Sequence, residues 1–515
     1  MGQNLKERLS RDILEYRAAA EKFKNGELAP ADYKGISGGF GTYPQKGNET
    51  HMLRLRMTGG RLPLERLRFL VDSCEKYKVG AVKLTTCQSI QYHDVAVDDL
   101  YPLMSEAWEA GFITRGGGGN HPRNVMASPL SGVQKGENFD VLPYAEAAAD
   151  YLLQIAGVLK FPRKLKVAFS NSIENVTHAT FRDLGFVSTP DGKFDVWAAG
   201  GLGNKPMLGV CMDRGIDPAD VLYYVGAMVA TFREHGNYEN RNKARTRFMQ
   251  ETLGVDGLIR EFHKHLDALK ASESLKLTVC PTETEKKPDG TMAEGGRILA
   301  QKQTDLYAVS YHPFGGYLPV AMLGKLYGAM QTMQGTEIRV TPDGGLYVIH
   351  CTAKEAKTIL ALTEGGAETA FERSVACVGG TRCSTGTIDS QGLLTACLAA
   401  VKKENFADGV LPTVRISGCP SSCAAHQTAA LGFRGGTKRG KNGVKPAFAV
   451  FVGGSELQGK EALAPTGHMI FADLIPTFLV TLGKAIRLEN TTFDRWIKEH
   501  EEDLADMIGE FANME

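Results

Sequence analysis

The stretch KLTTCQSIQYHDV, residues 83–95, has a counterpart later in the chain, EIRVTPDGGLYVIHC, residues 337–351. Each copy predicts two short strands joined by a tight turn, because strand-forming residues flank turn-forming ones. The same expected elements surround both copies in the same order. They are a strand, a helix, the two strands and a second helix, at residues 52–57, 64–77, 80–95 and 98–111, and again at 307–312, 323–333, 337–351 and 352–364. This pattern predicts an internal repeat of a split β-α-β unit.

A larger segment of mixed helix and strand character follows each repeat. The first opens with RNVMASP, residues 123–129, and the second with RSVACVGG, residues 373–380, which resemble each other. We therefore predict an α+β fold that is internally duplicated about a pseudo-twofold axis, with two ferredoxin-like half-domains and two larger mixed α/β domains. The expected units are an N-terminal arm, the first half-domain, the first larger domain, the second half-domain and the second larger domain, at residues 1–50, 51–115, 116–299, 300–364 and 365–515.

Composition argues against several classes of protein. The 515 residues include 59 basic and 59 acidic side chains, so the basic excess of a nucleic-acid-binding domain is missing. No run approaches about 18 uncharged apolar residues, so no membrane span is expected. The first residues, MGQNLKERLSRDILEYR, predict a charged amphipathic helix and not a signal peptide, because they lack an apolar central segment. We expect a cytoplasmic protein.

No motif in the chain predicts a nucleotide or flavin domain. GGTKRGKN, residues 435–442, has the glycine and lysine spacing of a phosphate-binding loop, but Asn stands where Ser or Thr would bind magnesium. The tract 437–446 and the glycine-rich stretch 115–122 are expected to be loops. Electrons for a redox reaction are therefore expected to come from a separate protein.

Two pairs of cysteines near the C-terminus differ from the six scattered ones. Cys377 and Cys383 form C-x5-C, and Cys419 and Cys423 form C-x3-C within GCPSSCAAHQ. In a large chain without a secretion signal, clustered cysteines indicate metal or redox chemistry more than disulfides. A [4Fe–4S] cluster accepts such spacings, whereas zinc ribbons usually have C-x2-C knuckles. A zinc site and a set of buried thiols are the alternatives.

The proline in the second cysteine pair suggests one local structure. If Cys423 begins a helix, Cys419 lies at its entry and Pro420 favours the first turn. The thiolates would then be stabilised by the positive end of the helix and by nearby backbone N–H groups.

Cationic side chains gather in apolar, strand-like surroundings although the net charge is zero. Arg54 and Arg56 lie two residues apart, as do Lys164 and Lys166, so each pair shares one face of a strand. Isolated cations on strands usually point to solvent. Two like charges on one face repel unless an anion lies between them, so several such pairs indicate a strongly anionic ligand. The other members of the set are Arg123, Arg163, Arg241, Lys243, Arg245 and Arg247.

These motifs together resemble the sirohaem-dependent sulfite and nitrite reductases. The resemblance rests on C-x5-C followed by GCPxxC, on RNV ahead of a proline, on PRKxK, on the GGL glycines and on an RxxAR element. It extends over residues 50–500 and includes the internal duplication. The resemblance implies that the two larger domains are the mixed α/β sirohaem-reductase domains of that family.

The resemblance also implies a cofactor pair and a role for each motif. Cys377, Cys383, Cys419 and Cys423 would hold a [4Fe–4S] cluster, and Cys423 would in addition be the proximal ligand of the sirohaem iron. The carboxylates of sirohaem would account for the cationic clusters. The positions that match distal-pocket cations of the family, and so catalytic residues, are Arg54, Arg123, Lys164 and Lys166. The positions that match residues lining or binding the macrocycle are Thr85, Gln91, Gly201, Arg245 and Ser421.

The reaction implied is the six-electron reduction of sulfite to sulfide. The K-x-K pattern at Lys164 and Lys166 resembles the sulfite reductases of the family, whereas its plant-type nitrite reductases carry Asn at the second position. Sulfite is therefore the expected substrate, and nitrite, reduced to ammonia, is the alternative. A non-catalytic iron–sulfur carrier or sensor is a further hypothesis. The electron donor would be ferredoxin or a flavoprotein subunit. The chain departs from the family at Cys87, where an Arg that meets a sirohaem carboxylate is usual.

Overall fold

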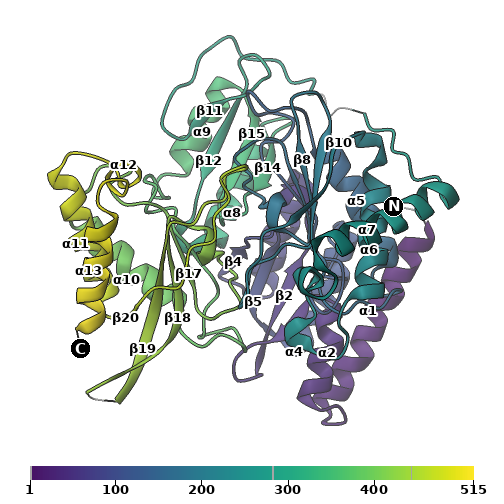
Figure 1. Ribbon diagram of the computed structural model, residues 1–515. Coiled ribbons are helices and arrows are strands. Elements are labelled where there is room, and N and C mark those ends of the chain that lie inside the picture. Colours follow the sequence, from purple (N-terminus) through teal and green to yellow (C-terminus); the bar gives the residue numbers. More distant parts are fainter. Residues whose placement is uncertain (1–2, 281–283, 442, 515) are drawn as a thin grey trace.

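Four five-stranded sheets organise the described part of the chain, and they form two matching pairs. The computed structural model describes residues 3–280, 284–441 and 443–514. Figure 1 shows a C-terminal lobe, coloured green to yellow, beside the sheets and helices of the preceding chain. The N-terminal helices α1 (Gln3–Lys24) and α2 (Pro30–Gly39), in purple, lie on the other side of the molecule in this view.

The first pair of sheets is built from the internal repeat. Their strand orders are β1-β2-β5-β4-β13 and β11-β12-β15-β14-β3, and the paired strands are antiparallel. Each sheet is completed by a strand from the other repeat, since β13 pairs with β4 and β3 pairs with β14. The strands are β1 (Thr42–Pro44), β2 (Thr50–Leu55), β3 (Arg61–Leu62), β4 (Ala81–Leu84), β5 (Ile90–Ala96), β11 (Ile298–Ala300), β12 (Tyr307–Tyr311), β13 (Tyr317–Pro319), β14 (Glu337–Val340) and β15 (Leu346–Cys351).

The two half-domains share one hydrophobic core. Leu70 from the first repeat and Ile338 from the second are both fully buried in it. The helices that pack here are α3 (Leu64–Lys76), α4 (Val97–Glu109), α8 (Val320–Met330) and α9 (Ala353–Leu362). The last of these begins with a capping box, in which Thr352 and Glu355 each bond the other's backbone N–H. Because the core and the exchanged strands are common to both, the half-domains form one structural unit.

The second pair of sheets has one topology used twice. In each, the first three strands are parallel and the last two are antiparallel. We call β6 to α7 the first lobe and β16 to α13 the second lobe. The first lobe holds β6 (Met126–Ala127), β7 (Val167–Ser170), β8 (Leu184–Ser188), β9 (Phe194–Ala198), β10 (Val210–Ile216), α5 (Leu142–Ile155), α6 (Val221–His235) and α7 (Met249–Ser272). The second holds β16 (Val375–Ala376), β17 (Val414–Ser417), β18 (Leu431–Gly440), β19 (Gly443–Val452), β20 (Met469–Phe471), α10 (Ser390–Lys402), α11 (Ile475–Leu488), α12 (Phe493–Trp496) and α13 (Glu501–Asn513). The predicted α+β fold with internal duplication is confirmed.

The duplication extends to single residues in the loop after the second strand of each lobe. In both lobes this loop leads into a 3-10 turn, η2 (Ala179–Phe181) or η7 (His426–Thr428). The residue before each turn has a left-handed backbone, with φ of 60° at His178 and 59° at Ala425. The segments SNSIENV, residues 170–176, and SGCPSSC, residues 417–423, therefore occupy equivalent positions. Only the second carries thiols.

Two local expectations are wrong. No helix begins at Cys423, because Ser422 and Ala425 adopt left-handed conformations and the chain continues into η7 and β18. The tract 437–446 is not an open loop, since most of it forms the ends of β18 and β19, which pair as a hairpin from Leu431↔Val452 to Gly440↔Gly443. Its polar and glycine residues fit an exposed hairpin as well as a loop. Residue 442, the last position of the phosphate-loop pattern, lies outside the described residues.

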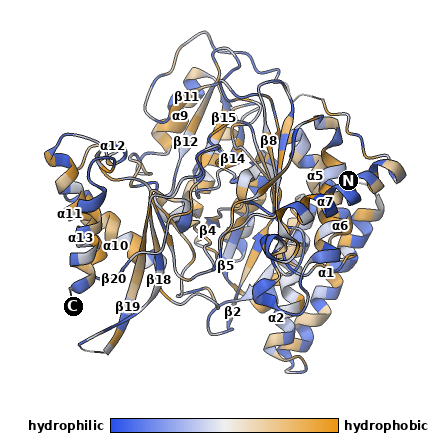
Figure 2. Ribbon diagram, viewed as in Figure 1, coloured by the Kyte–Doolittle hydropathy of each residue, from blue (hydrophilic) through white to orange (hydrophobic). Residues whose placement is uncertain are grey.

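The helices of the second lobe carry one apolar and one polar face. Figure 2 shows both colours along α11 and α13. Ile475, Phe478 and Leu482 of α11 are fully buried against the lobe's core. Across the described ranges, none of the helices combines the length and the apolar character needed to cross a bilayer.

The close approach of β18 to η7 generates a stability prediction. A Cβ at Gly432 would lie 2.1 Å from the His426 carbonyl oxygen, so Gly432→Ala forces the turn that follows the cysteine loop to move. Overpacking of this kind costs about 1–3 kcal/mol, and we expect Tm to fall by several degrees in calorimetry. Gly328→Ala is the control, because Gly328 lies in α8 with no atom within 4 Å of the added carbon. Equal Tm values for the two variants would contradict the close contact.

Candidate active site

The loops of the second lobe bring the candidate cluster cysteines to one end of its sheet. Cys377 follows β16, and the C-x3-C pair follows the neighbouring parallel strand β17. The two loops touch, because the Gly418 backbone N–H donates to the Cys377 sulfur at 3.2 Å. The segment containing Cys383 folds back onto the same place, where Thr387 Oγ1 donates to the Gly418 carbonyl at 2.9 Å. All four thiols therefore belong to loops that meet at Gly418.

Cys423 is exposed to solvent and yet surrounded by protein atoms. Burial, together with the nearby Cys377 and Cys419, raises the pKa of its thiol to about 12. Lys164 and Lys166 of the first lobe act in the opposite direction, which places them within electrostatic range of Cys423. A metal centre would favour the thiolate form that this environment otherwise opposes.

The first half-domain also touches the cysteine loop. Thr86 Oγ1, in the turn between β4 and β5, donates to the Cys423 carbonyl at 2.8 Å. Lys83 Nζ donates to the Ala376 carbonyl at 3.2 Å, and burial lowers the Lys83 pKa to about 7. The sequence pattern did not single out these residues for a role, because Thr and Lys beside a turn usually face solvent. Both contacts join segments that are far apart in the chain.

Arg54 and Arg123 converge on one backbone carbonyl. The guanidinium of each donates to the Gly117 oxygen, that of Arg123 at 3.0 Å. Arg54 lies opposite Gln91 in the β2–β5 pair. When the Gln91 side-chain amide is oriented with its oxygen toward the Arg54 guanidinium, this oxygen accepts from Arg54 Nε at 3.1 Å. Burial and the charge of Arg54 together lower the pKa of Arg123 to about 10.

Lys164 and Lys166 lie immediately before β7, next to Arg123. The Arg123 backbone N–H donates to the Leu165 carbonyl at 2.8 Å, which fixes the three cations in one place. Lys166 Nζ donates to the Cys87 sulfur at 3.3 Å. Burial lowers the pKa of Lys164 well below its ordinary value, and neighbouring cations, Lys166 and Arg123 among them, lower it further.

A single buried carboxylate, Asp183, holds part of this cationic group. It accepts from the Lys166 backbone N–H at 2.8 Å. Both of its carboxylate oxygens accept from Arg245 Nη2, each at 2.9 Å. Gly201 leaves space beside that pair, since a Cβ there would lie 3.3 Å from Arg245 Nη2. Asp183 was missed in the sequence because a lone acid between two apolar strands gives no spacing signal.

Thr85 and Ser421 lie in the two turns beside the cysteines. Thr85 Oγ1 accepts from the Ser89 backbone N–H at 3.0 Å, which closes the turn between β4 and β5. Its hydroxyl therefore shapes the turn that presents Thr86 and Cys87. Ser421 is exposed in the loop between Cys419 and Cys423.

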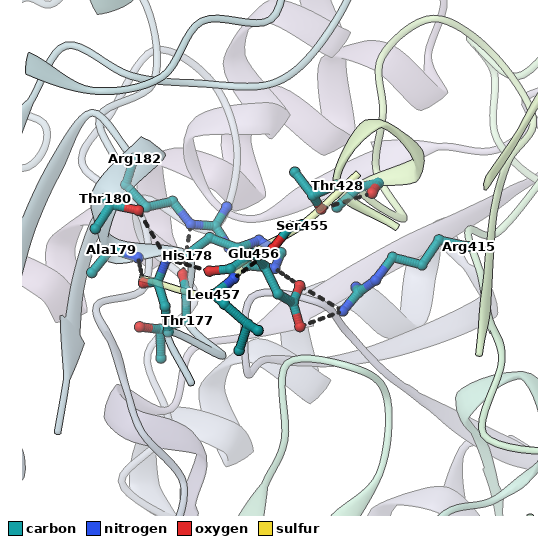
Figure 3. Close-up of polar contacts among 12 residues, drawn as sticks. Thr177, His178, Ala179, Thr180, Arg182, Arg415, Thr428, Ser455, Glu456 and Leu457 are labelled. Carbon is teal, nitrogen blue, oxygen red and sulfur yellow. Dashed lines mark hydrogen bonds and ion pairs between the residues drawn. The ribbon is translucent and has the colours of Figure 1, made fainter. Parts of the chain in front are cut away.

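A buried polar network joins the two lobes beside these loops (Figure 3). Glu456 accepts from His178 Nε2 at 2.6 Å and from Arg415 Nη2 at 3.0 Å. Arg182 approaches the other ring nitrogen of His178 at 3.4 Å. Burial lowers the His178 pKa to about 4. Burial opposes ionisation of Glu456, but Arg415 and His178 outweigh it and lower the Glu456 pKa to about 2. Near neutral pH, a neutral imidazole therefore donates to a carboxylate.

Comparison with known proteins agrees with this arrangement. The model described as the nitrite and sulphite reductase 4Fe-4S domain matches residues 118–269, and the model of the nitrite/sulfite reductase ferredoxin-like half domain matches residues 43–110. The chain belongs to the nitrite and sulfite reductase family. The 4Fe-4S domain model falls on the first lobe, which has the same topology as the lobe that carries the thiols.

Similar proteins in the nitrite and sulfite reductase family carry two kinds of name. A ferredoxin–nitrite reductase of Synechococcus elongatus is 26% identical over 420 residues, which is 78% of this chain and 80% of that protein. A sulfite reductase [ferredoxin] of Mycobacterium tuberculosis is 25% identical over 471 residues, 88% of this chain and 82% of that protein. A solved structure of the M. tuberculosis NirA protein matches 98% of both chains with a TM-score of 0.77 at 23% identity, which shows the same fold.

The residues present fit the cofactors of the nitrite and sulfite reductase family, a [4Fe–4S] cluster and sirohaem. Four thiols meet at one end of the second lobe's sheet, which suits the cluster. Cations of the first lobe lie near these thiols. Among them, Arg245 and the Lys166 backbone bond the carboxylate of Asp183. Side-chain nitrogens without a hydrogen-bond partner in the described ranges remain among them: Arg123 Nε, Arg245 Nε and Arg247 Nη1. Buried cations with spare donors suit the carboxylates of sirohaem.

A single zinc ion does not fit the thiols. Tetrahedral zinc with four thiolates would hold the sulfurs about 3.8 Å apart, given a Zn–S distance of about 2.3 Å. Within the part of the chain that the structure describes, no three cysteine sulfurs lie within 4.8 Å of one another.

Loss of one thiol tests the cluster assignment. Cys423→Ser should lower both the iron content and the haem absorption of the purified protein, because Cys423 would be a ligand of both cofactors. Cys280→Ser is the matched control, since Cys280 is exposed and belongs to neither pair. A Cys423→Ser protein with the iron content and spectrum of the control would contradict the assignment.

The network between the lobes predicts acid sensitivity. The His178 pKa lies below its ordinary value of 6.5, so the unfolded chain gains a proton more readily and stability falls as pH drops from about 6.5 to 4. For a shift of this size the loss is roughly 3 kcal/mol. His178→Gln should therefore lose less Tm between pH 7 and pH 4.5 than the wild type does. His263→Gln, in a half-exposed pair with Asp213, is the control, and parallel Tm curves for all three proteins would refute this origin.

Proposed function

We propose that the protein is a sulfite reductase that carries out the six-electron reduction of sulfite to sulfide. The observation that supports this proposal is the group of Arg54, Arg123, Lys164 and Lys166, held together by shared backbone carbonyls and lying within electrostatic range of one another. Burial opposes the charge of several of these cations, so an anion that enters the group relieves an existing cost.

The side chains of this group account for the anion chemistry. Sirohaem coupled to a [4Fe–4S] cluster supplies the electrons and the metal site when both are bound. Arg54 and Arg123 keep fixed positions through the Gly117 carbonyl and neutralise the bound oxyanion, which polarises its S–O bonds. Lys164, whose pKa is well below the ordinary lysine value, releases a proton more readily than a solvent-exposed lysine. It is therefore the proposed proton donor to an oxygen that leaves as water.

The electrons require an external donor. The relatives named above are ferredoxin-dependent by name, and we infer ferredoxin as the donor for this chain, with a flavoprotein subunit as the alternative. A non-catalytic iron–sulfur carrier is a weaker hypothesis, because a carrier has no need for a buried group of cations that binds an oxyanion.

Nitrite reduction to ammonia is the second candidate, and the contact of Lys166 with Cys87 supports it. The Cys87 sulfur accepts from Lys166 Nζ at 3.3 Å, and a thiolate there would cancel the extra cation that favours doubly charged sulfite. Anaerobic turnover of the cofactor-loaded protein with each anion separates the candidates. The electron source should be a chemically reduced viologen prepared without dithionite, which itself releases sulfite. Sulfide as the product with the higher kcat/KM supports sulfite reductase, and ammonia supports the second candidate.

Lys166→Asn tests the role of that side chain in substrate preference. We expect kcat/KM for sulfite to fall about tenfold and that for nitrite to fall less, because one positive charge near the anion is worth on the order of 1.4 kcal/mol. Lys160→Asn, at an exposed position in the same segment, is the control. Equal losses for sulfite and nitrite would show that Lys166 does not select the substrate.

A further inference from the structure

The turn that carries Cys87 is rigid and faces the cationic group. Thr85 N–H donates to the Ser89 carbonyl at 3.0 Å, and Asn124 Nδ2 donates to the Cys87 carbonyl at 3.0 Å. The adjacent Gln88 is fully buried, and its side chain bonds the carbonyls of Gly59, Ala127 and Val340. The position of the Cys87 sulfur is therefore set by the backbone of three different segments.

Cations from four segments of the chain lie within electrostatic range of Cys87. Lys166 comes from the segment before β7, Arg182 from the segment before β8, Arg54 from β2 and Arg123 from the segment before β6. Burial would raise the pKa of the Cys87 thiol, but Lys166, Arg182 and Arg54 outweigh it and lower that pKa to about 6. The neighbouring carboxylate, Asp183, bonds Arg245 and the backbone of Lys166.

The contact with Lys166 changes what the cationic group offers to an anion. Lys166 Nζ donates to the Cys87 sulfur at 3.3 Å, so a thiolate there offsets part of the positive charge that Lys166 offers to a substrate. The negative sulfur also repels an incoming anion, and Coulomb's law doubles that repulsion for a doubly charged anion. Near neutral pH, sulfite is a mixture of singly charged hydrogen sulfite and the doubly charged anion, whereas nitrite carries one charge.

We propose that Cys87 is a specificity-determining residue whose thiolate pairs with Lys166 and makes the site prefer singly charged oxyanions, hydrogen sulfite or nitrite, over doubly charged sulfite. This inference rests on the proposed oxyanion reduction and adds the charge state of the substrate. Arg54, Arg123 and Lys164 remain to neutralise the single charge.

Binding of the two anions to the cofactor-loaded protein tests the proposal without turnover. Isothermal titration calorimetry at pH 8 gives Kd for sulfite and for nitrite. In Cys87→Ser, which keeps the size but loses the charge, the selectivity between the two should shift about tenfold toward sulfite relative to the wild type. Cys87→Asp keeps a negative charge and should retain the wild-type selectivity. Cys211→Ser, a half-buried thiol on β10, is the control.

The outcomes separate this inference from the proposed function. A selectivity shift in Cys87→Ser that Cys87→Asp restores supports the charge of Cys87 as its cause. Equal shifts in both variants, or none in either, overturn it, because the selectivity then does not follow the charge. Failure of the wild type to reduce sulfite or nitrite would refute the proposed function, and the calorimetric ratio would still report on Cys87.

Discussion

Buried positive charge with too few carboxylates is the constraint on which the site depends. Lys164, Lys166, Arg123 and Arg245 lie in one region, and Asp183 is the carboxylate that bonds part of it. Such a group is costly unless anions enter it, because burial and mutual repulsion both oppose the charged forms. The fold meets this cost locally with backbone carbonyls such as that of Gly117. The remaining cost is one that an entering carboxylate or oxyanion would relieve.

The two duplicated lobes share a topology but carry different functional side chains. Both use the same topology and the same left-handed turn before a 3-10 segment, at His178 and at Ala425. The loop of the second lobe carries two of the four thiols, whereas its counterpart at 170–176 has polar and apolar residues. The first lobe instead supplies Lys164, Lys166 and Arg245, and its His178 bonds Glu456 of the second lobe. The same loop geometry thus carries two of the proposed cluster thiols in one lobe and an interlobe contact in the other.

The repeat and the motif residues could be predicted from the sequence because their signals are local. Periodicity marks the strands and helices of each half-domain, and fixed spacing marks the cysteines and the paired cations. The exchanged strands could not be predicted, because β3 has two residues and β13 three, and their partners lie in the other repeat. Asp183 and Thr86 were missed for the same reason, since their contacts join distant segments. The hairpin at 431–452 contradicted a local reading of glycine and lysine as loop residues.

In the proposed site, thiols of the second lobe and cations of the first lobe and first half-domain hold two cofactors together. Counting iron, acid-labile sulfide and sirohaem on the same purified sample tests it most directly. We expect one sirohaem for each cluster, so that the iron content exceeds the sulfide by one atom per chain. Iron equal to sulfide without haem absorption would contradict it and would indicate a cluster protein that carries electrons but does not reduce an oxyanion.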